Sequence, residues 1–281
     1  MLKIIQQDNN KFLLEGTDIN LKKTFSCGQC FRWHPYKQGW TGIVNKQPVY
    51  AIQAENGIIL EDTTIQQIHN IWIDYFDLER NYSHIIKYYD SDPFILQCYH
   101  FGKGIHILHQ DPLETIISFI FSANNNIKRI QQIIENFCYL YGTEVKYKNK
   151  FFYTFPSEEQ LKNITLESLQ QIKAGFRDKY IIDFICRLTK NPEFISQLAN
   201  ATTEEARQIL LQCKGIGNKI CDCILLFAFQ RFECFPKDVW INRITNKIYG
   251  KKFDQHHLGA YAGLIQQYYF YYGRSNPAQF S

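Results

Sequence analysis

The chain has 281 residues, of which 45% are hydrophobic and 16% aromatic, and its formal net charge at pH 7 is +4. This composition excludes a disordered chain, and the length allows one or two domains with a sizeable core. The apolar runs are far shorter than the ~20 residues of a membrane span, and no signal peptide is visible, so we expect a soluble, intracellular protein with no membrane contact.

Short segments rich in aromatic and β-branched residues open the chain and are separated by turn residues. They predict strands of an antiparallel sheet at 31–36, 39–44, 48–55 and 57–62. Residues 63–78 then show apolar side chains at helical spacing, and the remainder of the chain is helical in character. We therefore predict an α+β fold, with a sheet domain over residues 1–98 and an α-helical body over residues 99–281.

Two successive helices are predicted within residues 110–137. Asp111 is a helix cap, and Glu114 follows it at the spacing of a capping motif. The run Asn124–Asn126 breaks the first helix and starts the second, which by itself is ordinary turn and cap chemistry. Arg129 is expected to point away from the apolar face of the second helix.

Another helix pair, over residues 166–188, is broken at Ala174 and Gly175. The next two residues are Phe176 and Arg177, and beside a glycine turn an aromatic ring can project and an arginine can reach a partner. A core aromatic residue and a solvated arginine fit the same pattern.

Near the carboxy terminus, residues 259–273 predict a short helix on which Gln266 and Phe270 share a face. Several aromatic residues follow one another on this helix. Since such a stripe is usually core packing, the pattern alone gives Phe270 no function.

The most informative stretch runs from residue 213 to residue 238. Gly215 and Gly217 form a tight turn between a predicted helix that ends near residue 212 and an apolar helix that starts near residue 218. A helix–hairpin–helix of this kind leaves free N–H groups and the positive end of a helix dipole facing outwards, where a phosphate can bind. A turn that merely connects two helices has the same sequence.

Charge is distributed unevenly along the chain. Residues 1–96 carry 9 basic and 11 acidic side chains, a net −2, whereas residues 97–281 carry 22 and 16, a net +6. The positive half contains the glycine hairpin, as expected if this half meets a polyanion, although solvated surface also accounts for a modest excess.

Two residues of the hairpin region suggest chemistry. Lys219 lies in the first turn of the second helix, where the dipole disfavours an ammonium charge and a neutral amine can act as a nucleophile. Asp238 is predicted to cap the next helix, with its carboxylate held ionised by N–H groups. This pair suits cleavage at a sugar carbon that becomes cationic, but a surface lysine and a purely structural cap fit the sequence as well.

Nine cysteines in an intracellular chain are expected to be reduced thiols. Cys221 and Cys223 lie about 200° apart on a helix and cannot share a ligand face. No cysteine follows Cys234, which excludes a carboxy-terminal iron–sulfur loop. We predict no metal site and no cofactor.

The hairpin segment KGIGNKICDC followed by FPKDVW resembles the helix–hairpin–helix DNA glycosylases, and in particular their 8-oxoguanine DNA glycosylase branch. SCGQCFRW, QDPLETIISFIFSANNNIKRI, AGFRDKYI and GAYAGLIQQYYF resemble further family segments in family order, so the likeness covers nearly the whole chain. It implies a sheet domain followed by a helical body. It also implies excision of 8-oxoguanine from duplex DNA opposite cytosine, and strand nicking by β-elimination, in base excision repair.

The resemblance also implies roles for the residues that match the family motifs. Lys219 would be the nucleophile that forms a Schiff base, and Asp238 the carboxylate that stabilises the cationic sugar. Gly28 would accept, through its carbonyl, the N7 proton that 8-oxoguanine has and guanine lacks. The remaining residues of the implied base site would read the Watson–Crick edge or sandwich the base: Gln266, Phe270 and Cys223. A dipole between Lys219 and a Cys223 thiolate would assist recognition.

On the DNA side, the resemblance implies that Asn124 fills the space of the flipped nucleotide while Arg129 and Arg177 read the orphaned cytosine. Phe176 stands where animal members carry a tyrosine wedge, and it can intercalate without donating a hydrogen bond. Trp240 stands where the family often has a histidine that contacts phosphate.

Gly215 and Gly217 would contribute to the phosphate contacts of the hairpin. The implied partner is double-stranded DNA containing 8-oxoguanine, bound by a monomer. The expected compartment is the cytoplasm, associated with the nucleoid in a bacterium, or the nucleus in a eukaryote. Two other functions remain open, an alkylpurine glycosylase, which usually lacks the lysine, and a non-catalytic DNA-binding module, which needs neither Lys219 nor Asp238.

Overall fold

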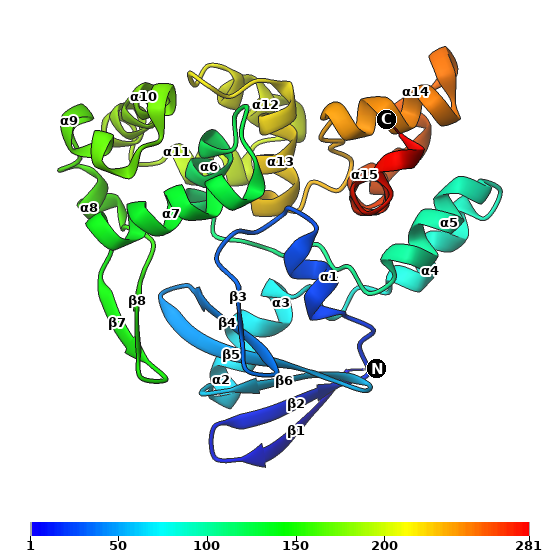
Figure 1. The fold of residues 1–281 in the computed structure, drawn as a ribbon, viewed down its shortest axis with the longest axis horizontal. Coiled ribbons are helices and arrows are strands. Elements are labelled where there is room, and N and C mark those ends of the chain that lie inside the picture. The colour runs from blue at the N-terminus through cyan, green and yellow to red at the C-terminus, as the bar shows by residue number, and fades with distance from the viewer. Residues whose placement is uncertain (1, 281) are drawn as a thin grey trace.

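The computed structural model describes residues 2–280. An amino-terminal antiparallel sheet lies on one side of the molecule, and a larger helical body lies on the other (Figure 1). The sheet has six strands in the order β1-β2-β6-β5-β4-β3. They are β1 (Lys3–Asp8), β2 (Lys11–Glu15), β3 (His34–Tyr36), β4 (Gly39–Val44), β5 (Gln47–Ala54) and β6 (Gly57–Glu61). The predicted α+β fold is confirmed.

Fifteen α-helices are present within residues 2–280. They are α1 (Leu21–Ser26), α2 (Ile65–Gln67), α3 (Ile73–Tyr75), α4 (Tyr82–Ile86), α5 (Pro93–Gly102), α6 (Pro112–Phe121), α7 (Ile127–Tyr141), α8 (Glu158–Leu161), α9 (Leu166–Leu169), α10 (Asp178–Lys190), α11 (Phe194–Asn200), α12 (Thr203–Leu211), α13 (Asn218–Phe229), α14 (Val239–Ile248) and α15 (Ala262–Ser275). A hairpin of β7 (Glu144–Tyr147) and β8 (Lys150–Tyr153) extends from the helical body towards the sheet (Figure 1). Each of these helices is too short or too polar to cross a bilayer.

The sheet differs from the predicted one at both ends. The prediction omitted β1 and β2, which extend the sheet beyond β6 and bury Phe12 and Leu14. The predicted strand 31–36 is a strand only from His34, because the residues before it turn towards the helical body. Phe31 packs edge-on against Phe119 of α6, with ring centroids 5.6 Å apart.

Two apolar clusters form the core. One lies between the sheet, α1 and residues 68–78, and the other fills the helical body and includes Cys27 and Phe31 from the loop after α1. Helices α4 and α5 pack with the second cluster, and α5 lies along α15. The α1–β3 loop, α13 and α15 therefore meet in one region. The division after residue 98 stays a prediction.

Candidate active site

The glycine hairpin predicted from sequence is present. Gly215 has φ +84°, and a Cβ there would collide with the ring of Tyr180, so only glycine fits. Gly217 is the N-cap residue of α13 and faces open space, since no atom lies within 4 Å of the position that a Cβ would take. The first N–H groups of α13 therefore point outwards from a turn that presents no side chain.

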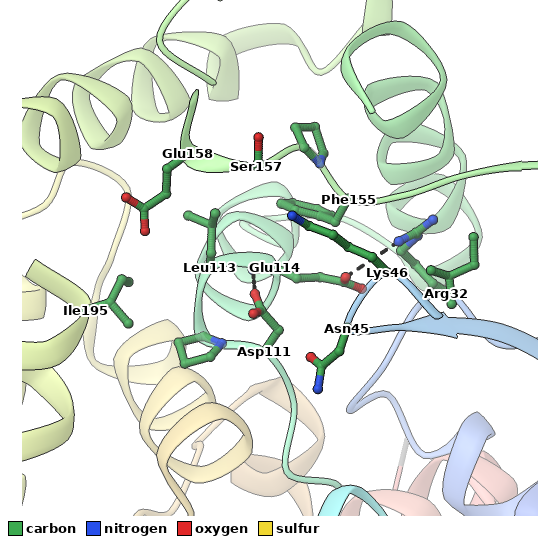
Figure 2. Close-up of a pocket in the computed structure, with 13 residues that line it drawn as sticks. Arg32, Asn45, Lys46, Asp111, Leu113, Glu114, Phe155, Ser157, Glu158 and Ile195 are labelled. Atoms are coloured by element: carbon green, nitrogen blue, oxygen red, sulfur yellow. Dashed lines mark hydrogen bonds and ion pairs between the residues drawn. The ribbon is translucent and has the colours of Figure 1, made fainter. Parts of the chain in front are cut away.

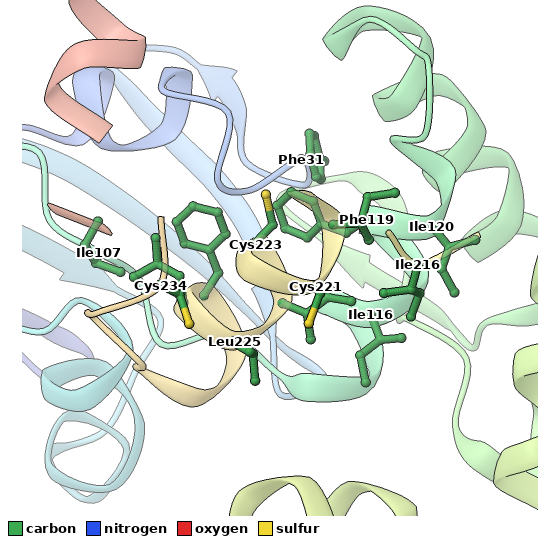
Figure 3. Close-up of a cluster of buried hydrophobic side chains, with 14 of the residues drawn as sticks. Phe31, Ile107, Ile116, Phe119, Ile120, Ile216, Cys221, Cys223, Leu225 and Cys234 are labelled. Atoms are coloured by element: carbon green, nitrogen blue, oxygen red, sulfur yellow. The ribbon is translucent and has the colours of Figure 1, made fainter. Parts of the chain in front are cut away.

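Lys219 lies half-buried in the first turn of α13, with its Nζ 5.5 Å from the ring centroid of Phe119. Cys223 follows one turn later, beside Phe119 at the edge of the apolar cluster between α13 and α6 (Figure 3). Burial raises the pKa of Cys223 to about 11, although Lys219 acts in the opposite direction. Burial therefore disfavours the thiolate of Cys223 in the free protein, and the implied dipole with Lys219 stays a prediction.

Asp238 caps α14 as predicted, and its Oδ1 accepts a hydrogen bond from the N–H of Ile241 at 2.9 Å. Burial nevertheless raises the pKa of Asp238 above its ordinary value, against the opposing effects of the Ile241 N–H and the charge of Lys219. The cap on its own had predicted a lowered pKa for Asp238, because N–H groups stabilise the ionised carboxylate. The sequence could not reveal this difference, because the burial comes from the surrounding elements.

A cavity of about 110 Å³ joins residues from four parts of the chain. Six of its lining residues were singled out from the sequence: Gly28, Lys219, Cys223, Asp238, Gln266 and Phe270. A nucleophilic amine and a carboxylate thus face the same small space as an aromatic ring, a thiol and an amide. The cavity is also lined by Phe119, Asn125 and Gln267, to which the sequence interpretation assigned no function.

The Gly28 loop is held by a buried amide that the sequence interpretation missed. Gln29 is fully buried, and its Nε2 donates to the carbonyl of His106 at 2.8 Å. Its Oε1 accepts from the N–H of Leu108, also at 2.8 Å. Gln29 thus ties the loop to the segment that leads into α6. No local sequence pattern indicates this role, because Gln29 meets His106 and Leu108 only in the folded chain.

A second group of the predicted residues lies outside the cavity, around the turn before α7. Arg177 is buried, and its guanidinium donates to the carbonyls of Ala123 and Asn124, each at 2.8 Å. It also lies 4.4 Å from the ring centroid of Phe176, which is 51% exposed. Arg177 therefore joins the Asn124 turn to the Phe176 turn in the free protein, and does not extend into solvent.

The other two residues of this surface, Asn124 and Arg129, are exposed to solvent. Asn124 is exposed and has φ +46°, and Arg129 is exposed in the first turn of α7, pointing away from the core as predicted. Trp240 lies half-buried in the first turn of α14, with the Cζ of Arg243 5.4 Å from its ring centroid. Neither Trp240 nor the hairpin glycines reach the cavity.

A larger cavity, of about 390 Å³, lies elsewhere, between the β4–β5 turn and the start of α6 (Figure 2). Arg32 and Glu114 are in its wall, with Nη1 and Oε2 3.5 Å apart. Burial raises the pKa of Glu114 to about 7, although Arg32 opposes this. None of the residues predicted to act on a substrate lines this cavity.

The cysteines form no disulfide bonds, and no cluster of metal-binding side chains is found in the part of the chain that the structure describes. All nine cysteines are free. Within residues 2–280, no group of three or more His, Cys, Asp or Glu side chains is arranged to hold a metal ion.

Two family models match the chain in succession. Residues 11–116 match the amino-terminal domain of 8-oxoguanine DNA glycosylase, and residues 117–259 match the HhH-GPD superfamily of base excision DNA repair proteins. An N-glycosylase/DNA lyase of Saccharomyces cerevisiae is 27% identical over 276 residues, which cover 88% of this chain and 73% of the relative.

Solved structures agree with these matches over the full length. MBOgg1 in complex with a low-affinity DNA ligand is 36% identical and has a TM-score of 0.94, with 99% of each chain covered. The Clostridium acetobutylicum 8-oxoguanine glycosylase/lyase, in complex with double-stranded DNA containing cytosine opposite 8-oxoguanine, is 31% identical with a TM-score of 0.91. That match covers 99% of this chain and 98% of the other.

The Lys219 cavity lies where the two matched regions meet. Gly28 comes from the first region, and Lys219 and Asp238 come from the second. The chain belongs to the HhH-GPD superfamily of base excision DNA repair proteins, and its amino-terminal domain is of the 8-oxoguanine DNA glycosylase type.

Proposed function

We propose that the protein is a bifunctional DNA glycosylase and abasic-site lyase that removes 8-oxoguanine opposite cytosine in base excision repair. The observation that carries this proposal is the shared cavity, in which Lys219 and Asp238 face the same space as Phe270 and Gln266. The similarity to N-glycosylase/DNA lyases supports the enzyme class. A non-catalytic DNA-binding module would require none of these side chains to converge.

The base would enter the cavity after it is flipped out of the duplex. Phe270 and the neutral thiol of Cys223 both line the cavity and can contact the two faces of a purine. The Gly28 carbonyl would accept the N7 proton, and the amide of Gln266 would read the Watson–Crick edge. Flipping costs a few kcal/mol of stacking and pairing, which the inserted protein groups offset in part.

The chemistry begins with cleavage of the bond between C1′ and N9, whose electron pair leaves with the base. The Asp238 carboxylate would stabilise the cationic sugar, and the Lys219 amine would bond to C1′ and lose a proton. Opening of the C1′–O4′ bond then yields the Schiff base. Loss of a proton from C2′ expels the 3′-phosphate and nicks the strand, and no cofactor is needed.

The opposite base would be read on the surface formed by Asn124, Arg129, Phe176 and Arg177. Asn124 would fill the gap in the helix and Phe176 would intercalate beside it. Since Arg177 already binds two carbonyls of the Asn124 turn, its direct role in reading cytosine requires a rearrangement on DNA binding.

Phosphates would bind along the outward-facing start of α13, where Gly215 and Gly217 leave the backbone accessible, and beside Trp240 on α14. Binding by this surface should weaken steeply with salt, because phosphate contacts release counterions. We expect the protein to act as a monomer in the compartment that holds the genomic DNA.

Borohydride trapping tests the proposal. The protein is incubated with a duplex that contains 8-oxoguanine opposite cytosine, and borohydride then reduces any Schiff base to a stable covalent adduct. We expect an adduct with the unaltered protein and none with Lys219→Gln. The matched control is Lys214→Gln, which removes an exposed lysine of the same hairpin whose Nζ lies 3.3 Å from Asp183.

Two outcomes would count against the proposal. If the protein excises 8-oxoguanine but no adduct is trapped, the lysine mechanism is wrong. If Lys219→Gln still forms the adduct, the nucleophile is another residue. Excision of an alkylated purine in preference to 8-oxoguanine would favour the alkylpurine glycosylase, and repeating the assay with each base opposite the lesion measures the preference for cytosine.

A further inference from the structure

Two adjacent glutamines of α15 line the Lys219 cavity, and each is 3% exposed. The Nε2 of Gln267 donates a hydrogen bond to the Oε1 of Gln266 at 2.7 Å. Within residues 2–280, this is the one hydrogen bond made by either side-chain amide. The amide proposed to read the base is thus oriented by its neighbour.

The reverse orientation of the pair is disfavoured. As it stands, Gln267 Oε1 is the single buried amide atom of the pair without a protein partner within residues 2–280. If Gln266 donated instead, the amide nitrogen of Gln267 would occupy that position, with both of its N–H groups unpaired. Both orientations leave one amide atom of Gln267 unpaired. A buried N–H group without an acceptor is tolerated less often than a carbonyl oxygen without a donor, so Gln267 holds Gln266 with Oε1 towards itself and leaves the Nε2 of Gln266 free of protein acceptors.

The orientation of Gln266 matters because the Watson–Crick edges of purines differ in polarity. A 6-oxopurine such as 8-oxoguanine presents an acceptor at O6 and a donor at N1. A 6-aminopurine such as 8-oxoadenine presents a donor at N6 and an acceptor at N1. An amide with a fixed orientation can make both hydrogen bonds with only one of these edges, whereas an amide that flips freely can match either.

We propose that Gln267 is a specificity-determining positioning residue, which fixes the amide of Gln266 and restricts the cavity to 6-oxopurines. The inference rests on the proposed function, in which Gln266 reads the base edge. With Gln267 bound to one lone pair of Oε1, the other lone pair accepts from N1–H, and Nε2 donates to O6.

The unpaired Oε1 of Gln267 supports a role in recognition over a role in packing. An apolar side chain of similar size would fill the same buried position without an orphaned oxygen. The unpaired oxygen of Gln267 therefore lowers the stability of the fold, and an apolar residue would avoid this cost. Gln267 nevertheless occupies a position that lines the base cavity. Stability and specificity should therefore respond differently to its replacement.

The test replaces Gln267 by methionine, which keeps the length of the side chain and removes the amide. Single-turnover excision is measured on two duplexes, with 8-oxoguanine or 8-oxoadenine opposite cytosine. Both lesions carry N7–H and an 8-oxo group, so they differ in the edge that Gln266 reads. We expect the preference for 8-oxoguanine to fall by about 10-fold or more in Gln267→Met, with no fall in the thermal unfolding midpoint.

Tyr268→Phe is the matched control. Tyr268 is the next residue of α15, and its hydroxyl is also buried without a partner within residues 2–280, but it does not line the cavity. Its replacement should leave the preference unchanged. If Gln267→Met keeps the preference of the unaltered protein, the inference is wrong. If the unaltered protein does not excise 8-oxoguanine at all, the proposed function has failed instead.

Discussion

The backbone of Gly28 lies directly against the ring of Phe270. A Cβ at position 28 would be 2.9 Å from Cε1 of Phe270, and the residue has φ +83°. A loop that follows α1 and a helix near the carboxy terminus therefore form one wall of the Lys219 cavity. Only glycine allows this approach, since it lacks the Cβ and tolerates a positive φ.

Gly28→Ala should consequently damage both stability and base recognition. Strain and the collision with Phe270 are expected to cost about 1–3 kcal/mol of unfolding free energy, measured by chemical denaturation. Displacement of the ring should lower the discrimination between 8-oxoguanine and guanine. Gly250→Ala is the control, because Gly250 has φ +62° but nothing within 4 Å of a Cβ position. Unchanged discrimination in Gly28→Ala would refute the role assigned to this residue.

Substitutions of Asp238 can separate capping from catalysis. Asparagine retains the cap on the Ile241 N–H, so Asp238→Asn should be as stable as the unaltered protein, yet excise 8-oxoguanine at least ~100-fold more slowly. Asp238→Ala should in addition lose about 1 kcal/mol of unfolding free energy. If Asp238→Ala excises 8-oxoguanine slowly while Asp238→Asn is fully active, Asp238 contributes to excision only as a helix cap.

The raised pKa of Asp238 predicts the acid limb of the activity. The carboxylate has to be ionised to stabilise a cationic sugar, and burial shifts its protonation to a higher pH than for an ordinary aspartate. Excision should therefore decline, as pH falls, at a pH above ~4. An acid limb at or below that pH would contradict the assignment of Asp238.

Arg177 and Arg129 are expected to respond differently to removal. Arg177→Ala leaves the carbonyls of Ala123 and Asn124 without their donor and should cost about 3 kcal/mol of unfolding free energy. Arg129 is exposed, so Arg129→Ala should change stability by less than ~0.5 kcal/mol. Arg129→Ala should nevertheless reduce the preference for cytosine opposite the lesion, measured by excision from the four possible duplexes. An Arg177→Ala protein of normal stability would contradict the structural role described above.

Glu114 predicts a pH dependence of stability away from the active site. Its pKa is raised from 4.5 to about 7, so between these values the folded protein keeps a proton that the unfolded chain releases. Unfolding free energy should therefore fall as pH rises through this range, by up to about 3 kcal/mol. Glu114→Gln should flatten the slope in denaturation curves recorded from pH 4.5 to pH 7. Glu158→Gln, at the exposed rim of the same cavity, should leave the slope intact.

Much of the fold could be predicted from local patterns. The hairpin and its flanking helices depend on glycines, caps and apolar spacing within some 30 residues, and the caps at Asp111 and Asp238 are present as expected. Four strands were missed. Three of them, β1, β7 and β8, carry several exposed side chains, and β2 carries the unbroken apolar run Phe12–Leu14, which hides its alternating burial. Strands of this kind lack a strong alternating pattern, and their pairing partners stabilise them.

The candidate site likewise contains residues that local sequence predicts and features that depend on the folded chain. Local sequence was enough to predict a lysine at the start of a hairpin helix and a carboxylate at the next cap, because both positions follow from the neighbouring residues. Its likeness to a known family supplied the distant members of the site. Three features could be found only in the folded chain: the contact between Gly28 and Phe270, the raised pKa values of Cys223 and Asp238, and the hydrogen bond from Gln267 to Gln266. Desolvation and hydrogen bonding inside a cavity depend on all the elements that enclose it, and these elements are far apart along the chain.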